Sequence, residues 1–142
     1  MAKSKADLLR EIYSDDFMEG YLECLGFTEE ESLPERWAED YGDEDTELDD
    51  APSISFDKFD VASLKKIIKD CKGFMAKCEK AGLDLEAWGE TQAGHDFWLT
   101  RNDHGAGFWD RGRKDGDALS KIAKSFGEVY VSMGKTGSLY HS

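Results

Sequence analysis

The segment Gly94–Gly112 concentrates the side chains of this chain that could perform chemistry. It reads GHDFWLTRNDHGAGFWDRG, so histidines, aspartates and arginines alternate with two Phe-Trp pairs. Imidazole and carboxylate groups serve as metal ligands and as acid–base catalysts, and guanidinium groups bind phosphate. A small metal-dependent or hydrolytic enzyme would use this set. Its candidate residues are His95, Asp96, Arg101, His104 and Asp110.

The elements expected to position these groups argue against an active site. The near-repeat of Phe-Trp favours two short strands, 95–101 and 107–111, joined by a tight turn at 102–105. Because alternate side chains of a strand share a face, His95 and Asp96 would point to opposite sides. We therefore interpret the segment mainly as a structural hairpin whose polar groups hydrogen-bond to the turn backbone.

A single-stranded nucleic-acid binder is another class that this segment allows. Bases stack on exposed aromatic rings, and basic side chains follow the phosphates. The residues that would do this are Trp98, Arg101, Trp109 and Arg111. No wider basic patch accompanies them. The glycines at 105 and 107 lack both the strand-to-helix setting and the third glycine of a dinucleotide loop, so we expect them to form a turn.

Negative charge is the second prominent feature, and it is unevenly placed. The formal net charge is −13, and residues 11–60 contain 19 acidic side chains against 2 basic ones. Such a field opposes binding to nucleic acid and favours binding to a basic surface. The most crowded acids are Glu39, Asp40, Asp43, Glu44, Asp45, Glu47, Asp49 and Asp50.

Three interpretations of this acidic run remain open. One is a solvated, flexible segment at about 39–53, held open by self-repulsion. Another is a surface that imitates nucleic-acid phosphates, which needs many carboxylates on one face. A divalent-cation loop is the third. The run lacks the central glycine and the ligand order of an EF-hand, so we predict no metal site and no cofactor.

Hydrophobic spacing predicts an α+β fold in a single domain over 1–142, with a helical N-terminal half packed on a small antiparallel sheet. The clearest helix runs from Asp60, a good N-cap, to Ala81, with Gly82 as its stop. Further helices are expected around Leu8–Tyr13, from Asp16 to a stop at Gly26, from Thr28 or Ser32, and over 117–126, and strands over 128–133 and 138–141.

The cysteines and the hydropathy pattern fit a soluble protein of the cytoplasm. Cys71 and Cys78 lie seven residues apart on one expected helix, too far apart to form a disulfide, and Cys24 stands alone. We expect three reduced thiols. The chain has no apolar run long enough to span a membrane, and its first residues do not resemble a secretory signal.

Two sequence stretches resemble a known group of proteins. Gln92–Gly112 reads QAGHDFWLTRNDHGAGFWDRG, and Gly116–Val131 reads GDALSKIAKSFGEVYV. They resemble small uncharacterised proteins encoded by tailed bacteriophages, over roughly residues 13–141. The resemblance carries no catalytic residue with it. It implies viral origin and expression in the cytoplasm of a bacterial host.

These observations together favour a binding protein over an enzyme. We expect a phage-encoded acidic protein that engages a basic, nucleic-acid-handling host protein through the eight carboxylates at 39–50. Imitation of DNA phosphates, used to inhibit a host defence, is the most specific form of this hypothesis. The enzyme at 95–110 and the nucleic-acid binder remain the alternatives.

Overall fold

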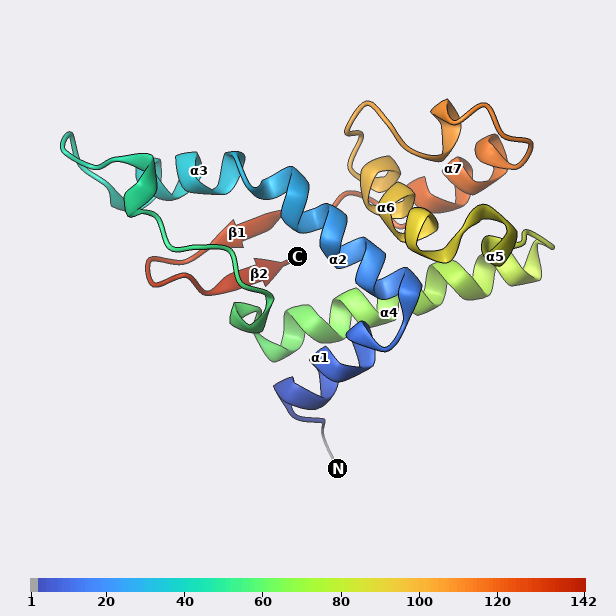
Figure 1. Cartoon of the computed structure of the whole chain (residues 1–142), viewed down its shortest axis with the longest axis horizontal. Helices are drawn as coiled ribbons and strands as arrows, with labels where there is room; N and C mark the ends of the chain where they lie inside the picture. The colour runs from blue at the N-terminus through green and yellow to red at the C-terminus, as the bar shows by residue number, and fades with distance from the viewer. Residues whose placement is uncertain (1–2) are drawn as a thin grey trace.

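The computed structural model describes residues 3–142 and shows an α+β fold, mostly helical with one two-stranded antiparallel sheet (Figure 1). The helices are α1 (Lys5–Tyr13), α2 (Asp16–Glu29), α3 (Ser32–Tyr41), α4 (Val61–Lys80), α5 (Leu85–Trp88), α6 (Glu90–Arg101) and α7 (Gly116–Lys124). The strands are β1 (Val131–Met133) and β2 (Leu139–His141), and 3₁₀ turns occur at η1 (Leu48–Asp50), η2 (Phe56–Lys58) and η3 (Phe108–Asp110). Within residues 3–142, none of the helices is both long and apolar enough to cross a membrane.

Strong local signals predicted several elements correctly. The Asp60 side chain accepts a hydrogen bond from the Ser63 backbone N–H and begins α4, and Gly82 follows this helix with a φ of 76°. The strands pair in antiparallel register, with Ser132 opposite Tyr140. This hairpin lies between α3 and α4 (Figure 1), so helices from the first half of the chain do pack on the sheet.

The predicted hairpin at 95–111 is wrong. Residues 90–101 form α6, and 108–110 form the 3₁₀ turn η3. The cause is burial around most of the helix: Asp96, Phe97, Trp98, Thr100 and Arg101 are all buried. A helix that is covered on several sides has no single apolar stripe, so its 3.6-residue period is hard to recognise.

Two helix boundaries within residues 11–60, the most acidic part of the chain, also differ from expectation. Helix α2 does not stop at Gly26 but continues to Glu29. Helix α3 extends to Tyr41, so Glu39 and Asp40 are helical, and 48–50 form η1. The acidic run therefore begins in the last turn of α3 and ends in the 3₁₀ turn η1, and its mobility stays a prediction.

Helices α2 and α6 approach each other so closely that two glycines are required at their contact. A Cβ added to Gly94 would lie 2.1 Å from the carbonyl oxygen of Phe17 and 2.7 Å from the backbone nitrogen of Tyr21. A Cβ on Gly20 would lie 2.3 Å from the Thr91 carbonyl oxygen. The absence of side chains thus lets the two backbones touch and brings α6 against the centre of the molecule.

Stacked aromatic rings fill the core beside this contact. The Phe74 ring of α4 stacks on the Phe97 ring of α6, with centroids 4.3 Å apart and planes 16° apart. Phe17 from α2 and Phe108 from η3 each lie 5.6 Å from Phe74 in further stacked pairs. Three of the four aromatic residues of the 94–112 segment, Phe97, Trp98 and Phe108, are therefore fully buried core residues, whereas Trp109 is exposed.

Replacing Gly94 with alanine should destabilise the fold, although alanine is the better helix former. The methyl group must displace the backbone of α2, so we expect the free energy of unfolding to fall by about 2 kcal/mol or more. Urea denaturation followed by circular dichroism measures this. Gly134→Ala is the control, because the nearest atom to its Cβ is 3.7 Å away. Equal stability of the two variants would refute the close contact.

Candidate functional site

The eight carboxylates predicted to bind a partner lie together at one end of the molecule. We call residues 39–50 the acidic tip. Figure 1 shows this segment beyond the far end of α3, away from α6 and α7. All eight carboxylate residues are exposed, and within residues 3–142 none of them makes an ion pair with a basic side chain.

Hydrogen bonds within the acidic tip give it a defined turn structure. The Asp43 carboxylate accepts from the backbone N–H of Asp45 at 3.0 Å and from the Thr46 hydroxyl at 3.1 Å. The Asp50 carboxylate accepts from the Glu47 backbone N–H at 2.9 Å. Asx turns of this kind shape a loop without basic partners. The charges are therefore held on the surface rather than neutralised within it.

Apolar side chains adjoin the acidic tip. Leu48 is 52% exposed, and Phe27 on α2 is 78% exposed. Both line a hollow between α2 and the 48–56 segment, which Asp49 and Glu30 also line. Exposed apolar groups within an acidic surface are a feature of protein interfaces rather than of a solvated linker.

In the predicted alternative site, Asp96 is fully buried and belongs to a structural network. Its carboxylate accepts from the indole N–H of Trp88 at 3.0 Å, from Gln92 at 3.1 Å and from Arg111 Nη2 at 2.7 Å. These donors satisfy the buried charge and tie α5, α6 and the segment after η3 together. Hydrogen bonding to Asp96 also raises the pKa of Arg111.

Arg101 is buried in a second, separate network. Its guanidinium group donates to the Asp70 carboxylate at 3.0 Å and to the Tyr21 hydroxyl at 3.1 Å. It also donates to the carbonyl oxygens of Phe126 and Gly127 at 3.2 and 2.9 Å. Burial alone would raise the pKa of Asp70, but hydrogen bonds from Lys66 and Arg101 outweigh it and hold that pKa below its ordinary value.

Of the three other candidates, His95 and His104 lie apart from these networks, whereas the Asp110 carboxylate lies 4.0 Å from Arg111 Nε, at the edge of the Asp96 network. His95 lines a hollow between α2 and α6, and the imidazole of His104 stacks on Trp98, with centroids 6.0 Å apart. Asp110 accepts a hydrogen bond from the Gly107 backbone N–H at 2.9 Å. The structure therefore does not bring the five predicted catalytic residues into one pocket. No group of three or more potential metal ligands occurs within residues 3–142.

The residues proposed to stack on bases are mostly engaged inside the protein. Trp98 is fully buried, and its indole N–H donates to the Thr28 hydroxyl at 2.8 Å. Arg101 and Arg111 pair with Asp70 and Asp96. Only Trp109, which is 49% exposed, presents its ring to solvent. Few of the residues proposed to stack on bases or pair with phosphates are therefore available to a single-stranded nucleic acid.

The buried network also contains His141, which sequence analysis did not select. Its Nε2 lies 2.8 Å from the Tyr21 hydroxyl oxygen, its backbone N–H donates to Ser63, and its buried Nδ1 has no partner within residues 3–142. Burial, followed by repulsion from Arg101 and Lys66, lowers the pKa of His141 to about 3. No local motif reveals this contact, because Tyr21 and His141 are 120 positions apart.

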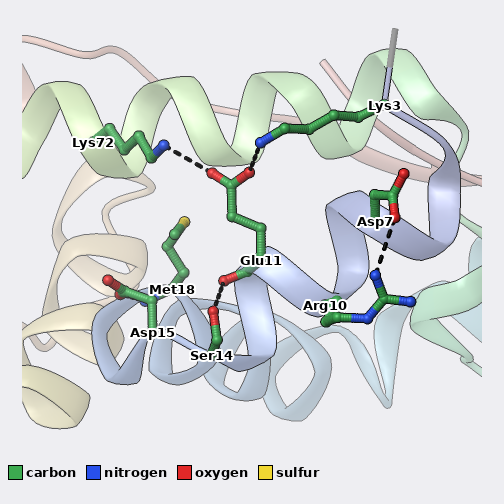
Figure 2. Close-up of a pocket in the computed structure, with 8 residues that line it drawn as sticks. All are labelled: Lys3, Asp7, Arg10, Glu11, Ser14, Asp15, Met18 and Lys72. Atoms are coloured by element: carbon green, nitrogen blue, oxygen red, sulfur yellow. Dashed lines mark hydrogen bonds and ion pairs between the residues drawn. The ribbon is translucent and has the colours of Figure 1, made fainter. Parts of the chain in front are cut away.

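A shallow pocket beside α1 is occupied by the chain's own ion pairs. Figure 2 shows the Glu11 carboxylate between the ammonium groups of Lys3 and Lys72, with the Lys72 contact at 2.8 Å. Hydrogen bonds from these two lysines, Lys3 first, lower the pKa of Glu11. The pocket holds paired charges and no nucleophile in a catalytic setting, so it resembles a helix-docking contact of α1 on α4.

The three cysteines are free and buried, as expected. Burial raises the pKa of the Cys24 and Cys78 thiols to about 12 and that of Cys71 well above its ordinary value. Thiols of this kind are poor nucleophiles.

Comparison with known proteins finds no match for this chain: neither a family model, nor a curated protein, nor a solved structure matches it.

The buried imidazole makes stability depend on pH. The folded pKa of His141 is depressed, so its stabilising contribution is present above the unfolded pKa of 6.5 and is lost as pH falls towards about 3. Between pH 6 and 4 the unfolded chain binds about one proton more at this site, a slope of about 1.4 kcal/mol per pH unit. We expect His141→Gln to remove that slope, as measured by urea denaturation at several pH values.

His104→Gln is the control, because that exposed ring has no buried hydrogen bond to lose. An unchanged slope in the His141 variant, or an equal loss in the control, would show that the buried imidazole does not set the acid sensitivity.

Proposed function

We propose that this protein is an acidic binding protein that engages a basic, nucleic-acid-handling protein of a bacterial host. The observation that carries the proposal is the acidic tip: eight exposed carboxylates without basic partners within residues 3–142, held at one end of the fold. A basic partner could approach them without first breaking internal ion pairs, and its own charges would replace the missing counter-charges.

The distribution of charge supports this proposal further. Most of the net charge of −13 arises from the part of the chain that contains α2, α3 and the acidic tip. A concentrated field steers a basic partner to the charged end and speeds its association. The same field repels nucleic acid, which disfavours direct DNA or RNA binding at this end.

We further propose, from the sequence resemblance of 92–112 and 116–131 alone, that the protein is encoded by a tailed phage. A phage protein made in a bacterial cytoplasm meets host proteins that bind DNA or RNA through basic surfaces. A row of carboxylates can occupy such a surface in place of phosphates. We therefore propose counter-defence inhibition by DNA mimicry as the role of the acidic tip.

Neutralising the acidic tip should weaken partner binding. We would change Glu39, Asp40, Glu44 and Asp49 to their amides, because these side chains make no hydrogen bond within residues 3–142. The tagged protein first captures partners from host lysate at low salt, and calorimetry with the purified partner follows. We expect the variant to bind at least tenfold more weakly, with a flatter salt dependence.

A matched variant changes four exposed acids outside the tip: Glu79, Glu86, Asp117 and Glu128. It removes the same net charge and should retain most of the affinity. The captured partner should also release duplex DNA when this protein is added. Equal affinity of the wild type and the tip variant at all salt concentrations would overturn the proposal.

A further inference from the structure

A groove runs along the contact of α2 and α6, separate from the acidic tip. It consists of two hollows of about 390 and 360 Å³ that share Phe27, Thr28 and Leu99. The first also contains Cys24 and His95, and the second reaches His104 in the turn after α6. We call this surface the α2/α6 groove. Its volume is in the range of sites that accept a bulky side chain.

The floor of the groove is apolar. Leu99 of α6 is half-buried there, and Phe27 rises beside it with 78% of its surface exposed. Phe27 also lines the hollow beside Leu48 and Asp49, so one side chain separates the groove from the surface that leads to the acidic tip. An exposed aromatic ring with hollows on both sides is the arrangement from which interface hot spots are built.

Acidic side chains form the rim. Glu23 borders the first hollow, and Glu30 and Glu31 border the second. Neither Glu30 nor Glu31 makes an ion pair within residues 3–142, and Glu23 lies 3.9 Å from His95 Nε2. That Nε2 is buried and lacks a hydrogen-bond partner within residues 3–142, although its ring borders the groove.

We propose that the α2/α6 groove docks a basic amphipathic segment of a partner protein. A bulky apolar side chain of that segment would fill the hollow beside Phe27 and Leu99, and its Lys or Arg residues would pair with Glu23, Glu30 and Glu31. Charge complementarity selects this occupant. An acidic segment would meet the rim with like charges, and a wholly polar one would leave the floor exposed to water.

The inference rests on the proposed function in one respect, since both require a basic partner. It adds that recognition is not purely electrostatic. The acidic tip would attract the partner over a distance, whereas the α2/α6 groove would choose segments that carry an apolar anchor. The two surfaces therefore make different demands on the same partner, and they can be tested separately.

The test uses labelled helical peptides of about 18 residues, or five turns. The first carries lysine on one face and leucine on the other. A second has serine in place of leucine, and a third has glutamate in place of lysine. Fluorescence anisotropy at about 0.15 M salt measures binding to the full chain, and amide chemical shifts locate it. We expect the Lys/Leu peptide to bind most tightly and to shift residues 23–31 and 95–104.

Phe27→Ser should weaken binding of the Lys/Leu peptide about tenfold or more. Binding of the Lys/Ser peptide should not change, because that peptide has no leucine to contact the apolar floor. Trp109→Ser is the matched control, since it removes another exposed aromatic ring outside the groove. Phe27 is highly exposed, so its replacement leaves the core intact. Glu30→Gln with Glu31→Gln should weaken both lysine peptides.

The outcomes separate the two proposals. The proposed docking at the groove is refuted if the Lys/Leu and Lys/Ser peptides bind equally well or if Phe27→Ser changes the affinity of neither peptide. It is also refuted if the amide chemical-shift changes fall outside 23–31 and 95–104. The proposed function fails instead if the captured host partner binds the tip variant as tightly as the wild type. Binding of the Glu/Leu peptide to the groove would show that the rim does not select charge.

Discussion

The buried ion pair between Arg101 and Asp70 is the interaction on which most of this structure depends. The Arg101 side chain is fully buried, and its guanidinium group links α6 to α4, to α2 through Tyr21, and to the carbonyl groups after α7. A buried charge is tolerated only when it is paired and hydrogen-bonded, so these elements must adopt one mutual arrangement. Removing one partner of such a pair typically costs about 3–5 kcal/mol.

Buried hydrogen-bond networks also account for the charged residues of the 94–112 segment that the sequence placed in a catalytic site. Asp96 and Arg101 are each surrounded by internal partners, so neither is available to a substrate. Their function is to hold α6 between α2, α4 and the segment that follows η3. Gly20 and Gly94 also hold α6 in place, because their missing side chains let the backbones of α2 and α6 touch. The acidic tip, by contrast, presents exposed carboxylates without basic partners within residues 3–142, and the exposed side chains of Phe27 and Leu48 lie nearby.

Sequence reasoning succeeded where one local signal decided the outcome. Helix α4 was predicted closely because its apolar stripe, its Asp60 cap and Gly82 all agree. The β1–β2 hairpin was predicted because residues 128–133 alternate in the manner of a strand and the turn that follows contains Gly134 and Gly137. The eight acids were correctly placed on the surface by their charge alone, although Glu39 and Asp40 lie in α3 and Asp49 and Asp50 in the 3₁₀ turn η1.

The same reasoning failed for α6, because tertiary contacts decide the structure of that segment. Two Phe-Trp pairs resemble facing strands, yet one pair lies within a buried helix and the other in a 3₁₀ turn. His141 was missed for a related reason: its partners come from α2 and α4, which no spacing along the chain connects. The α2/α6 groove also depends on a helix pair that the sequence did not predict. Long-range packing, rather than local propensity, determines each of these features.

We propose that a partner binds at the acidic tip and the α2/α6 groove, which His95 and Leu99 help to line, whereas the buried side chains of α6, such as Asp96 and Arg101, hold the fold together. Hydrogen–deuterium exchange with and without the captured host partner tests it most directly. We expect new protection at 39–50, 23–31 and 95–104, and unchanged exchange at 106–116, around η3 and exposed Trp109. Protection confined to 106–116, with the acidic tip unaffected, would contradict it.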